Sequence, residues 1–250
     1  MTWIIIIIVT LTLVSYKEVQ GQLFNGEDIG FMVTIEYQNK PICSGSIISS
    51  VHVITAAQCT QRNEKDLLVH TLTKGPKPID SFFEILRIIS HPEYKLNPYG
   101  SQINDVALIR VRSSFNRVLH GQIFTVKLAD SKIPIISGST TRIVRYSESS
   151  LALKDYLIVD TNVCNGIYHG RGFVDDTQIC GVGYRSDFDF NGPADVIQNS
   201  CLRHAGDPII VERVIIGLTS WGDGCGDENY PVVYTQISHY RDWILNQTKY

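Results

Sequence analysis

Apolar residues along this chain fall into short runs that are separated by turn-forming residues. The runs cover 31–37, 41–48, 81–90, 140–145, 155–160, 209–218 and 231–237. Short segments of this kind, bounded by polar and turn-forming residues, are typical of β-strands. Many short strands and few helices predict an all-β fold, either a barrel or a sandwich.

Two segments depart from the strand pattern. Ile237, Tyr240 and Ile244 share one face of a helical projection, which predicts a C-terminal helix over 237–245. The apolar run 4–14 is too short to span a bilayer, which needs roughly 20 residues. It predicts a secretory signal peptide over 1–21, with cleavage after Ser15 as the other option, although a buried strand would also be apolar. No later run could span a membrane, so we expect a secreted, soluble protein.

Composition narrows the range of partners and the compartment. A chain of 250 residues is long enough for one large all-β domain or two small barrels. Its net charge of −3 gives no basic face for nucleic acid. Six cysteines in a secreted chain predict three disulfides in any of fifteen connectivities, and no Cys-x-x-Cys pair supports a zinc site. Nothing indicates a cofactor, while Asn246 begins an N-glycosylation sequon.

Three short motifs follow one another along the chain. The segment 52–59 ends in Thr-Ala-Ala-Gln-Cys, 104–109 reads Asn-Asp-Val-Ala-Leu-Ile, and 201–208 reads Cys-Leu-Arg-His-Ala-Gly-Asp-Pro. They resemble the Thr-Ala-Ala-His-Cys, Asn-Asp-Ile-Ala-Leu-Ile and Cys-x-Gly-Asp-Ser-Gly-Gly-Pro motifs of the chymotrypsin/trypsin family of serine proteases. Ser220-Trp221-Gly222 also fits, whereas Arg145-Tyr146-Ser147 lies where the family has Gly-Trp-Gly.

The resemblance covers roughly 23–245 and implies two packed six-stranded antiparallel β-barrels. The first barrel would cover about 23–127 and the second about 134–236, within a domain of residues 22–250. A link around 125–134 would join the barrels, and the C-terminal helix would close the chain. The resemblance also selects one disulfide pairing: Cys43–Cys59, Cys164–Cys180 and Cys201–Cys225.

The residues that would carry catalysis are altered. Gln58 lies at the position of the histidine base and Ala205 at that of the nucleophilic serine, whereas Asp105 is retained. A methyl group cannot form an acyl-enzyme, and a carboxamide cannot take up a proton near neutral pH. Arg203 replaces a glycine of the oxyanion loop, whose backbone geometry a side chain restricts. We therefore predict a proteolytically inactive homologue with no intact catalytic site.

Activation and specificity positions differ as well. The family buries a freed N-terminal amine against an Asp, but here the chain has Gln22 before Leu23, and His204 at the Asp position. At the base of the specificity pocket stands Asn199, and Val232 replaces a pocket-lining glycine. The chain retains Ser220, Trp221 and Gly222, which pair with the substrate backbone in the family. We also expect Ser220 and Asp105 to hydrogen-bond each other and so hold the two barrels together where they meet.

Other chemistry receives weak support from the sequence. A relocated triad of His204, Ser200 and Asp207 would need all three side chains to meet in hydrogen-bond geometry. A metal site on His204 and Asp207 would have only two ligands. We keep residual or relocated endopeptidase activity as one alternative.

A binding function is the main hypothesis. The chain resembles the scabies-mite inactivated protease paralogues, which are related to the group three mite allergens. That resemblance implies a protein partner among host plasma or complement proteins, with complement inhibition as the activity. The long, Asp-, Phe- and Gly-rich segment 184–197 is the candidate binding loop. The other alternative is a non-cleaving substrate decoy that binds through the remnant cleft.

Overall fold

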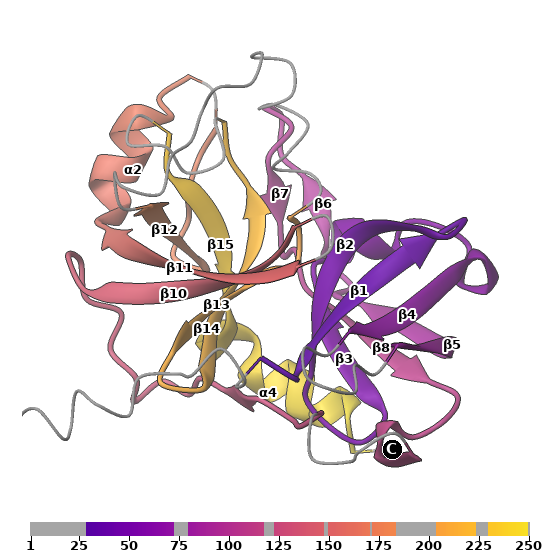
Figure 1. Ribbon diagram of the computed structural model, residues 1–250. Coiled ribbons are helices and arrows are strands. Elements are labelled where there is room, and N and C mark those ends of the chain that lie inside the picture. Colours follow the sequence, from indigo (N-terminus) through magenta and orange to yellow (C-terminus); the bar gives the residue numbers. More distant parts are fainter. Residues whose placement is uncertain are drawn as a thin grey trace, which may run out of the picture.

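The computed structural model describes residues 29–72, 80–117, 123–147, 150–170, 172–183, 204–223 and 230–249. Its elements form two β-barrels with a helix at the end of the chain (Figure 1). The strands are β1 Met32–Tyr37, β2 Lys40–Ile47, β3 His52–Thr55, β4 Leu67–Leu72, β5 Asp80–Ser90, β6 Lys95–Leu96, β7 Gln102–Ile103, β8 Ala107–Val111, β9 Lys127–Leu128, β10 Thr140–Ser147, β11 Ser150–Val159, β12 Gln178–Gly183, β13 Pro208–Val211, β14 Val214–Trp221 and β15 Val232–Gln236. The helices are the 3-10 helices η1 Ala57–Thr60, η2 Glu64–Asp66 and η3 Phe115–Arg117, and the α-helices α2 Thr161–Ile167 and α4 Ile237–Gln247.

The first barrel is closed by six antiparallel strands in the order β1-β2-β3-β8-β5-β4. Alternation along β1 shows why these residues form a barrel strand. Val33 and Ile35 point into the apolar interior, together with Val53, Val69 and Ile109 from other strands. Successive side chains of a strand point to opposite faces, so the residues between them lie on the outer face.

The second barrel is also a ring of six antiparallel strands, because β13 pairs with both β10 and β14. Its interior packs aliphatic side chains against the fully buried Tyr156 and Tyr234. The short strand β9 adds a seventh member by pairing in parallel with β14. The two barrels predicted from the sequence are therefore confirmed, and the segment between them contributes β9 to the second sheet.

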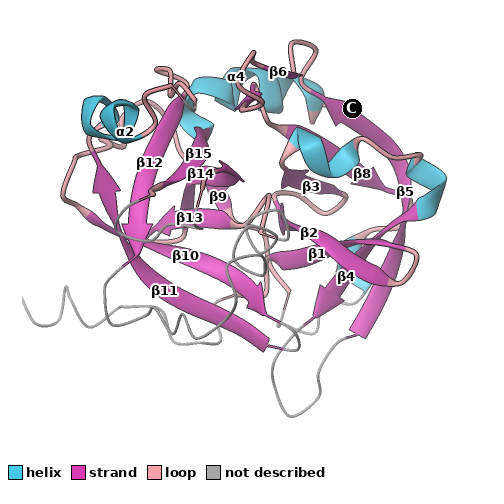
Figure 2. Ribbon diagram, turned by 90° about the horizontal axis from the view of Figure 1, so that it is seen from above, coloured by secondary structure: helices cyan, strands magenta, loops and turns pink. Residues whose placement is uncertain are grey.

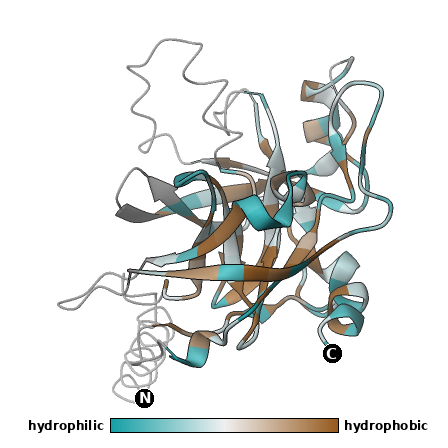
Figure 3. Ribbon diagram, turned by 90° about the vertical axis from the view of Figure 1, so that its right-hand side faces the viewer, coloured by the Kyte–Doolittle hydropathy of each residue, from teal (hydrophilic) through white to brown (hydrophobic). Residues whose placement is uncertain are grey.

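Helix α4 lies where the two barrels meet, seen from above in Figure 2. The three residues predicted to share one face, Ile237, Tyr240 and Ile244, are the buried residues of this helix. They pack in one apolar cluster with Ile54 of the first barrel and Leu218 of the second. Figure 3 shows hydrophobic residues along the strands and polar residues in many of the turns. The helix thus stabilises the relative placement of the two barrels.

One of the two α-helices described, α2, was not predicted. The run 155–160 is extended as expected up to Val159, where β11 ends, and α2 begins at Thr161. The cause is Asp160, whose side chain accepts hydrogen bonds from the amides of Asn162 and Val163. Such a cap satisfies donors that the first helical turn leaves unpaired.

Two of the three expected disulfides are formed. Cys43–Cys59 and Cys164–Cys180 have S–S distances of 2.03 and 1.96 Å. The third pair, Cys201–Cys225, lies outside the described residues, as do the expected signal peptide 1–21 and Leu23. Across the described part of the chain, no helix is long and apolar enough to cross a membrane.

Candidate functional site

Gln58 lies on η1, immediately after β3, at the seam between the barrels. Its peptide nitrogen donates to Asp105 Oδ1 at 2.9 Å, and its side-chain Nε2 donates to Asp105 Oδ2 at 2.7 Å. The same Nε2 donates to the backbone oxygen of Ser220 on β14 at 2.6 Å. A primary amide has two N–H donors, so both hydrogens of Gln58 are used. The side chain therefore ties the loop carrying Asp105 in the first barrel to β14 of the second.

The oxygen of the same amide continues the network. Gln102 Nε2 donates to Gln58 Oε1 at 3.4 Å, and Gln178 Nε2 donates to the backbone oxygen of Gln102 at 3.0 Å. Gln102 lies on β7 and Gln178 on β12, so three glutamines form a polar connection across the seam. Sequence reasoning missed Gln102 and Gln178 because no local motif marks either residue.

Asp105 is 1% exposed and accepts hydrogen bonds on both carboxylate oxygens. Ser220 Oγ donates to its Oδ2 at 2.6 Å, which is the expected contact between these two residues. Burial raises the pKa of Asp105, and the hydrogen bonds from Ser220 and Gln58 oppose that rise. Thr235 Oγ1 donates to the backbone oxygen of Asp105 at 2.9 Å. The carboxylate thus serves as the acceptor around which the seam is assembled.

Ala205 is fully buried, and its methyl group belongs to the apolar cluster of the first barrel, with Ala56 and the Cys43–Cys59 disulfide. Its backbone oxygen accepts a hydrogen bond from the amide of Ser44 at 3.0 Å. The next residue, Gly206, has φ of +82°, and a Cβ there would lie 2.1 Å from the Ser44 oxygen. Only glycine fits so close an approach. The site therefore places a methyl group, and no nucleophilic atom, at residue 205.

In the region expected to form a specificity pocket, the described residues pack closely against one another. Val232 is 3% exposed and packs inside the second barrel. Trp221 contacts the ring of Tyr168 edge-on, with centroids 4.9 Å apart. The Tyr168 hydroxyl donates to the oxygen of Pro231 at 2.6 Å and accepts from the amide of Asp223 at 3.1 Å. Tyr168 was missed from the sequence because its partners are more than 50 residues away.

Of the other residues expected at functional sites, some are described and some are not. His204 lies beside Asp207, with Nδ1 and Oδ2 3.1 Å apart. Among the described residues, no group of three His, Cys, Asp or Glu side chains could hold a metal ion. Asn199, Ser200, Arg203 and the segment 184–197 lie outside the described residues. Asn246 is exposed near the end of α4, and its Oδ1 accepts from Lys249 Nζ at 2.8 Å.

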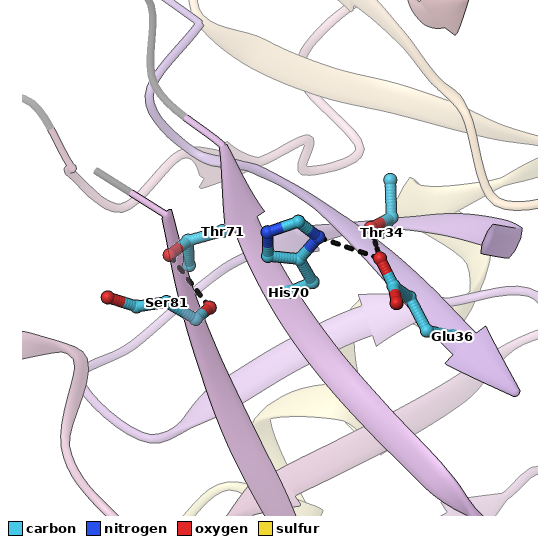
Figure 4. A network of polar contacts seen from close by, with 5 residues as sticks. All are labelled: Thr34, Glu36, His70, Thr71 and Ser81. Carbon is cyan, nitrogen blue, oxygen red and sulfur yellow. Dashed lines mark hydrogen bonds and ion pairs between the residues drawn. The ribbon is translucent and has the colours of Figure 1, made fainter. Parts of the chain in front are cut away.

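A second buried acid–histidine contact lies on the outer face of the first barrel (Figure 4). Glu36 Oε1 is 2.7 Å from His70 Nδ1 and accepts a hydrogen bond from Thr34 Oγ1 at 3.4 Å. The ring of Phe82 stacks on His70 with centroids 4.1 Å apart. In Figure 4 the hydroxyl of Thr71 is directed to the Ser81 oxygen, at 3.2 Å. The contacts of His70 with Glu36 and with Phe82 join neighbouring strands of the barrel, β1 with β4 and β4 with β5.

Comparisons with known proteins agree with this architecture. A family model described as Trypsin matches residues 18–244. The transmembrane protease serine 11B of Homo sapiens is 30% identical over 231 residues, which cover 87% of this chain and 52% of that protein. Trypsin of Phaedon cochleariae is 25% identical over 236 residues, covering 89% of this chain and 84% of that protein. This chain thus spans about half of the human relative.

A solved structure has a similar fold. Mouse neuropsin, described as a serine protease expressed in the limbic system of the brain, has a TM-score of 0.71 at 23% identity. The match covers 90% of this chain and 97% of the neuropsin chain. At this identity the likeness concerns the fold alone.

Proposed function

The chain belongs to the trypsin family of serine proteases, and we propose that within this fold it acts by binding a protein and not by cutting one. The relatives named above are proteases, so the proposal depends on what differs from them in the site. The observation that carries it is the Gln58 amide, which donates to both Asp105 and Ser220. A carboxamide locked in this way neither accepts a proton nor orients a base.

Ala205 supports the same conclusion. Acyl transfer in this family needs a nucleophile, a base and a group that orients the base. In another serine protease, loss of the nucleophile or the base alone lowers turnover by about a million-fold. Here the methyl of Ala205 is enclosed in an apolar cluster, and Asp105 already receives its hydrogen bonds from Gln58 and Ser220. We infer that no acyl-enzyme forms.

Binding through surface segments is favoured over a substrate decoy. A decoy would use the edge around Ser220 and Trp221 and a pocket behind it. One lone pair of the Ser220 oxygen is already used by Gln58, and Val232 packs in the barrel interior. A peptide would therefore find fewer free hydrogen-bond acceptors on this edge and less open space for a side chain. We therefore assign binding to segments such as 184–197, in an extracellular setting that the two disulfides favour.

The proposed partner is a host defence protein of plasma, with complement components as the first candidates. This narrower assignment depends on the resemblance to the inactivated mite paralogues. The test has two arms on the purified protein. A fluorophosphonate probe should label trypsin and leave this protein unlabelled. Immobilised protein should bind purified complement components, and replacing 184–197 with a Gly/Ser linker should abolish that binding, whereas changing Trp221 should not.

Two results would contradict the proposal. Covalent labelling by the probe would show a functional nucleophile and would end the non-catalytic assignment. Binding that is lost on changing Trp221 but survives replacement of 184–197 would support the decoy instead. Absence of binding to every complement component would remove the partner class while leaving the non-catalytic assignment intact.

A further inference from the structure

A second charged cluster lies just beyond Ala205, inside the second barrel. Asp207 is fully buried immediately before β13. Arg145 of β10 reaches it from the neighbouring strand, and its Nε lies 3.5 Å from Asp207 Oδ2. His204 Nδ1 approaches the same oxygen to 3.1 Å from within the turn. One carboxylate therefore faces two nitrogen groups from different parts of the chain.

The cluster is held more by charge than by aligned hydrogen bonds. Within the described residues, neither oxygen of Asp207 has a hydrogen-bond partner. Arg145 Nη2 also donates to the Tyr156 hydroxyl at 3.3 Å. Burial lowers the pKa of Arg145, but Tyr156 and Asp207 outweigh this effect and raise it. Burial also raises the pKa of Tyr234 well above its usual value, so this neighbouring hydroxyl remains neutral.

The charge balance of this site makes Arg145 and Asp207 mutually dependent. A buried carboxylate without a cation is strongly unfavourable, and so is a buried guanidinium without an anion. Arg145 and Asp207 have side-chain exposures of 15% and 0%. A second pair, Arg142–Asp155, joins β10 to β11 and has side-chain exposures of 23% and 50%. Removing one partner of the buried pair should thus destabilise the fold far more than removing one partner of the exposed pair.

Asp207 also lies within the backbone turn that carries Ala205. The amide of Gly206 donates to Thr219 O at 2.8 Å, and the amide of Thr219 donates to Asp207 O at 2.8 Å. The Asp207 amide closes the turn by donating to His204 O at 3.0 Å. The Asp207 side chain therefore anchors the turn to β10, while its backbone joins the turn to β14.

We propose that the Arg145–Asp207 pair is an internal ionic lock, which sets the 204–208 turn from within the second barrel whatever precedes residue 29. The cation is supplied by a side chain of the barrel, so the turn requires no amino terminus released by cleavage. The lock does not depend on whether the protein cuts or binds. It adds a structural function for two residues that belong to neither the base nor the nucleophile position.

The test begins with single and paired neutralisations in the full chain. Arg145→Met or Asp207→Asn should each lower the folding equilibrium constant by about a hundredfold or more, because each leaves one buried charge unpaired. The Arg145→Met/Asp207→Asn pair should lose at least tenfold less than the product of the single effects. The matched control is Arg142→Met with Asp155→Asn, for which coupling should stay below about fivefold. Coupling no larger than the control's would overturn the lock.

Hydrogen exchange supplies a second readout that needs no variant to fold. In the unaltered chain, the amides of Gly206, Asp207 and Thr219 should be protected to nearly the same degree as the core strands. Compared with a chain that begins at Gln22, the expected mature start, a copy with an uncleaved tag fused directly before Gln22 should show the same protection within about twofold. Loss of that protection in the tagged copy would show that the turn depends on a free amino terminus, and would overturn the proposal.

Discussion

Replacing Gln58 by alanine tests the seam most directly. The change removes the donor to Asp105 Oδ2 at 2.7 Å and the donor to Ser220 O at 2.6 Å. Leaving a buried charged acceptor short of a donor costs about 1–3 kcal/mol, and loss of an ordinary hydrogen bond costs about 1 kcal/mol. We therefore expect Gln58→Ala to lower the free energy of unfolding by about 3 kcal/mol near pH 7.

The pH dependence of this deficit identifies its cause. Burial already raises the pKa of Asp105, and the bonds from Ser220 and Gln58 hold it down. Without the Gln58 side chain, the pKa of Asp105 rises further in the folded state. Because the folded protein then binds a proton more readily, the deficit is full above the new pKa and shrinks as the pH falls through it.

The assay is urea unfolding followed by tryptophan fluorescence over a pH series. The matched control is Gln61→Ala, which removes a neighbouring glutamine whose Nε2 donates to Ala57 O at 2.9 Å from an exposed position. That control should cost no more than about 1 kcal/mol and show no such pH dependence. Equal losses in the two variants, or a Gln58→Ala deficit that grows at low pH, would show that the Gln58 amide does not stabilise the Asp105 carboxylate.

Three further predictions use other parts of the structure. Burial lowers the pKa of His91, which packs against Tyr240. The stability that neutral His91 contributes is therefore present above pH 6.5 and is lost as the pH falls through its folded pKa. His91→Phe should flatten this decline in thermal melts recorded at decreasing pH. Gly206→Ala should cost about 3 kcal/mol in urea unfolding, because φ is +82° and the new methyl would clash with backbone; a loss under 1 kcal/mol would contradict the turn geometry. Restoring the triad with Gln58→His and Ala205→Ser should not restore cleavage of a peptide library, because the pocket and oxyanion positions also differ; efficient cleavage would show that those positions remain competent.

Much of the fold could be predicted because its signals are local. Each strand run and each motif lies within about ten residues, and the face of α4 follows from three apolar side chains in one segment. The same holds for Gln58, Asp105 and Ala205, which were recognised from three short motifs. Their side-chain chemistry required no structure, although the double donation by the Gln58 amide did.

What could not be predicted depends on residues that meet only after folding. Arg145 and Asp207 are 62 positions apart, and no pattern along the chain links them. Gln178 reaches the seam from β12 across the barrel boundary. Strand β9 forms because Lys127 lies opposite Val214, a parallel pairing with no turn to signal it. Helix α2 is the exception, since the capping residue Asp160 is a local signal that the strand prediction passed over.

We propose that this member of the trypsin family binds a protein without cutting it. The most direct test is incubation of the purified protein with a proteome-derived peptide library, followed by mass spectrometry of new termini, with trypsin as the positive control. We expect no new termini above the buffer blank. New termini in molar excess over the added protein, at a reproducible sequence preference, would contradict it.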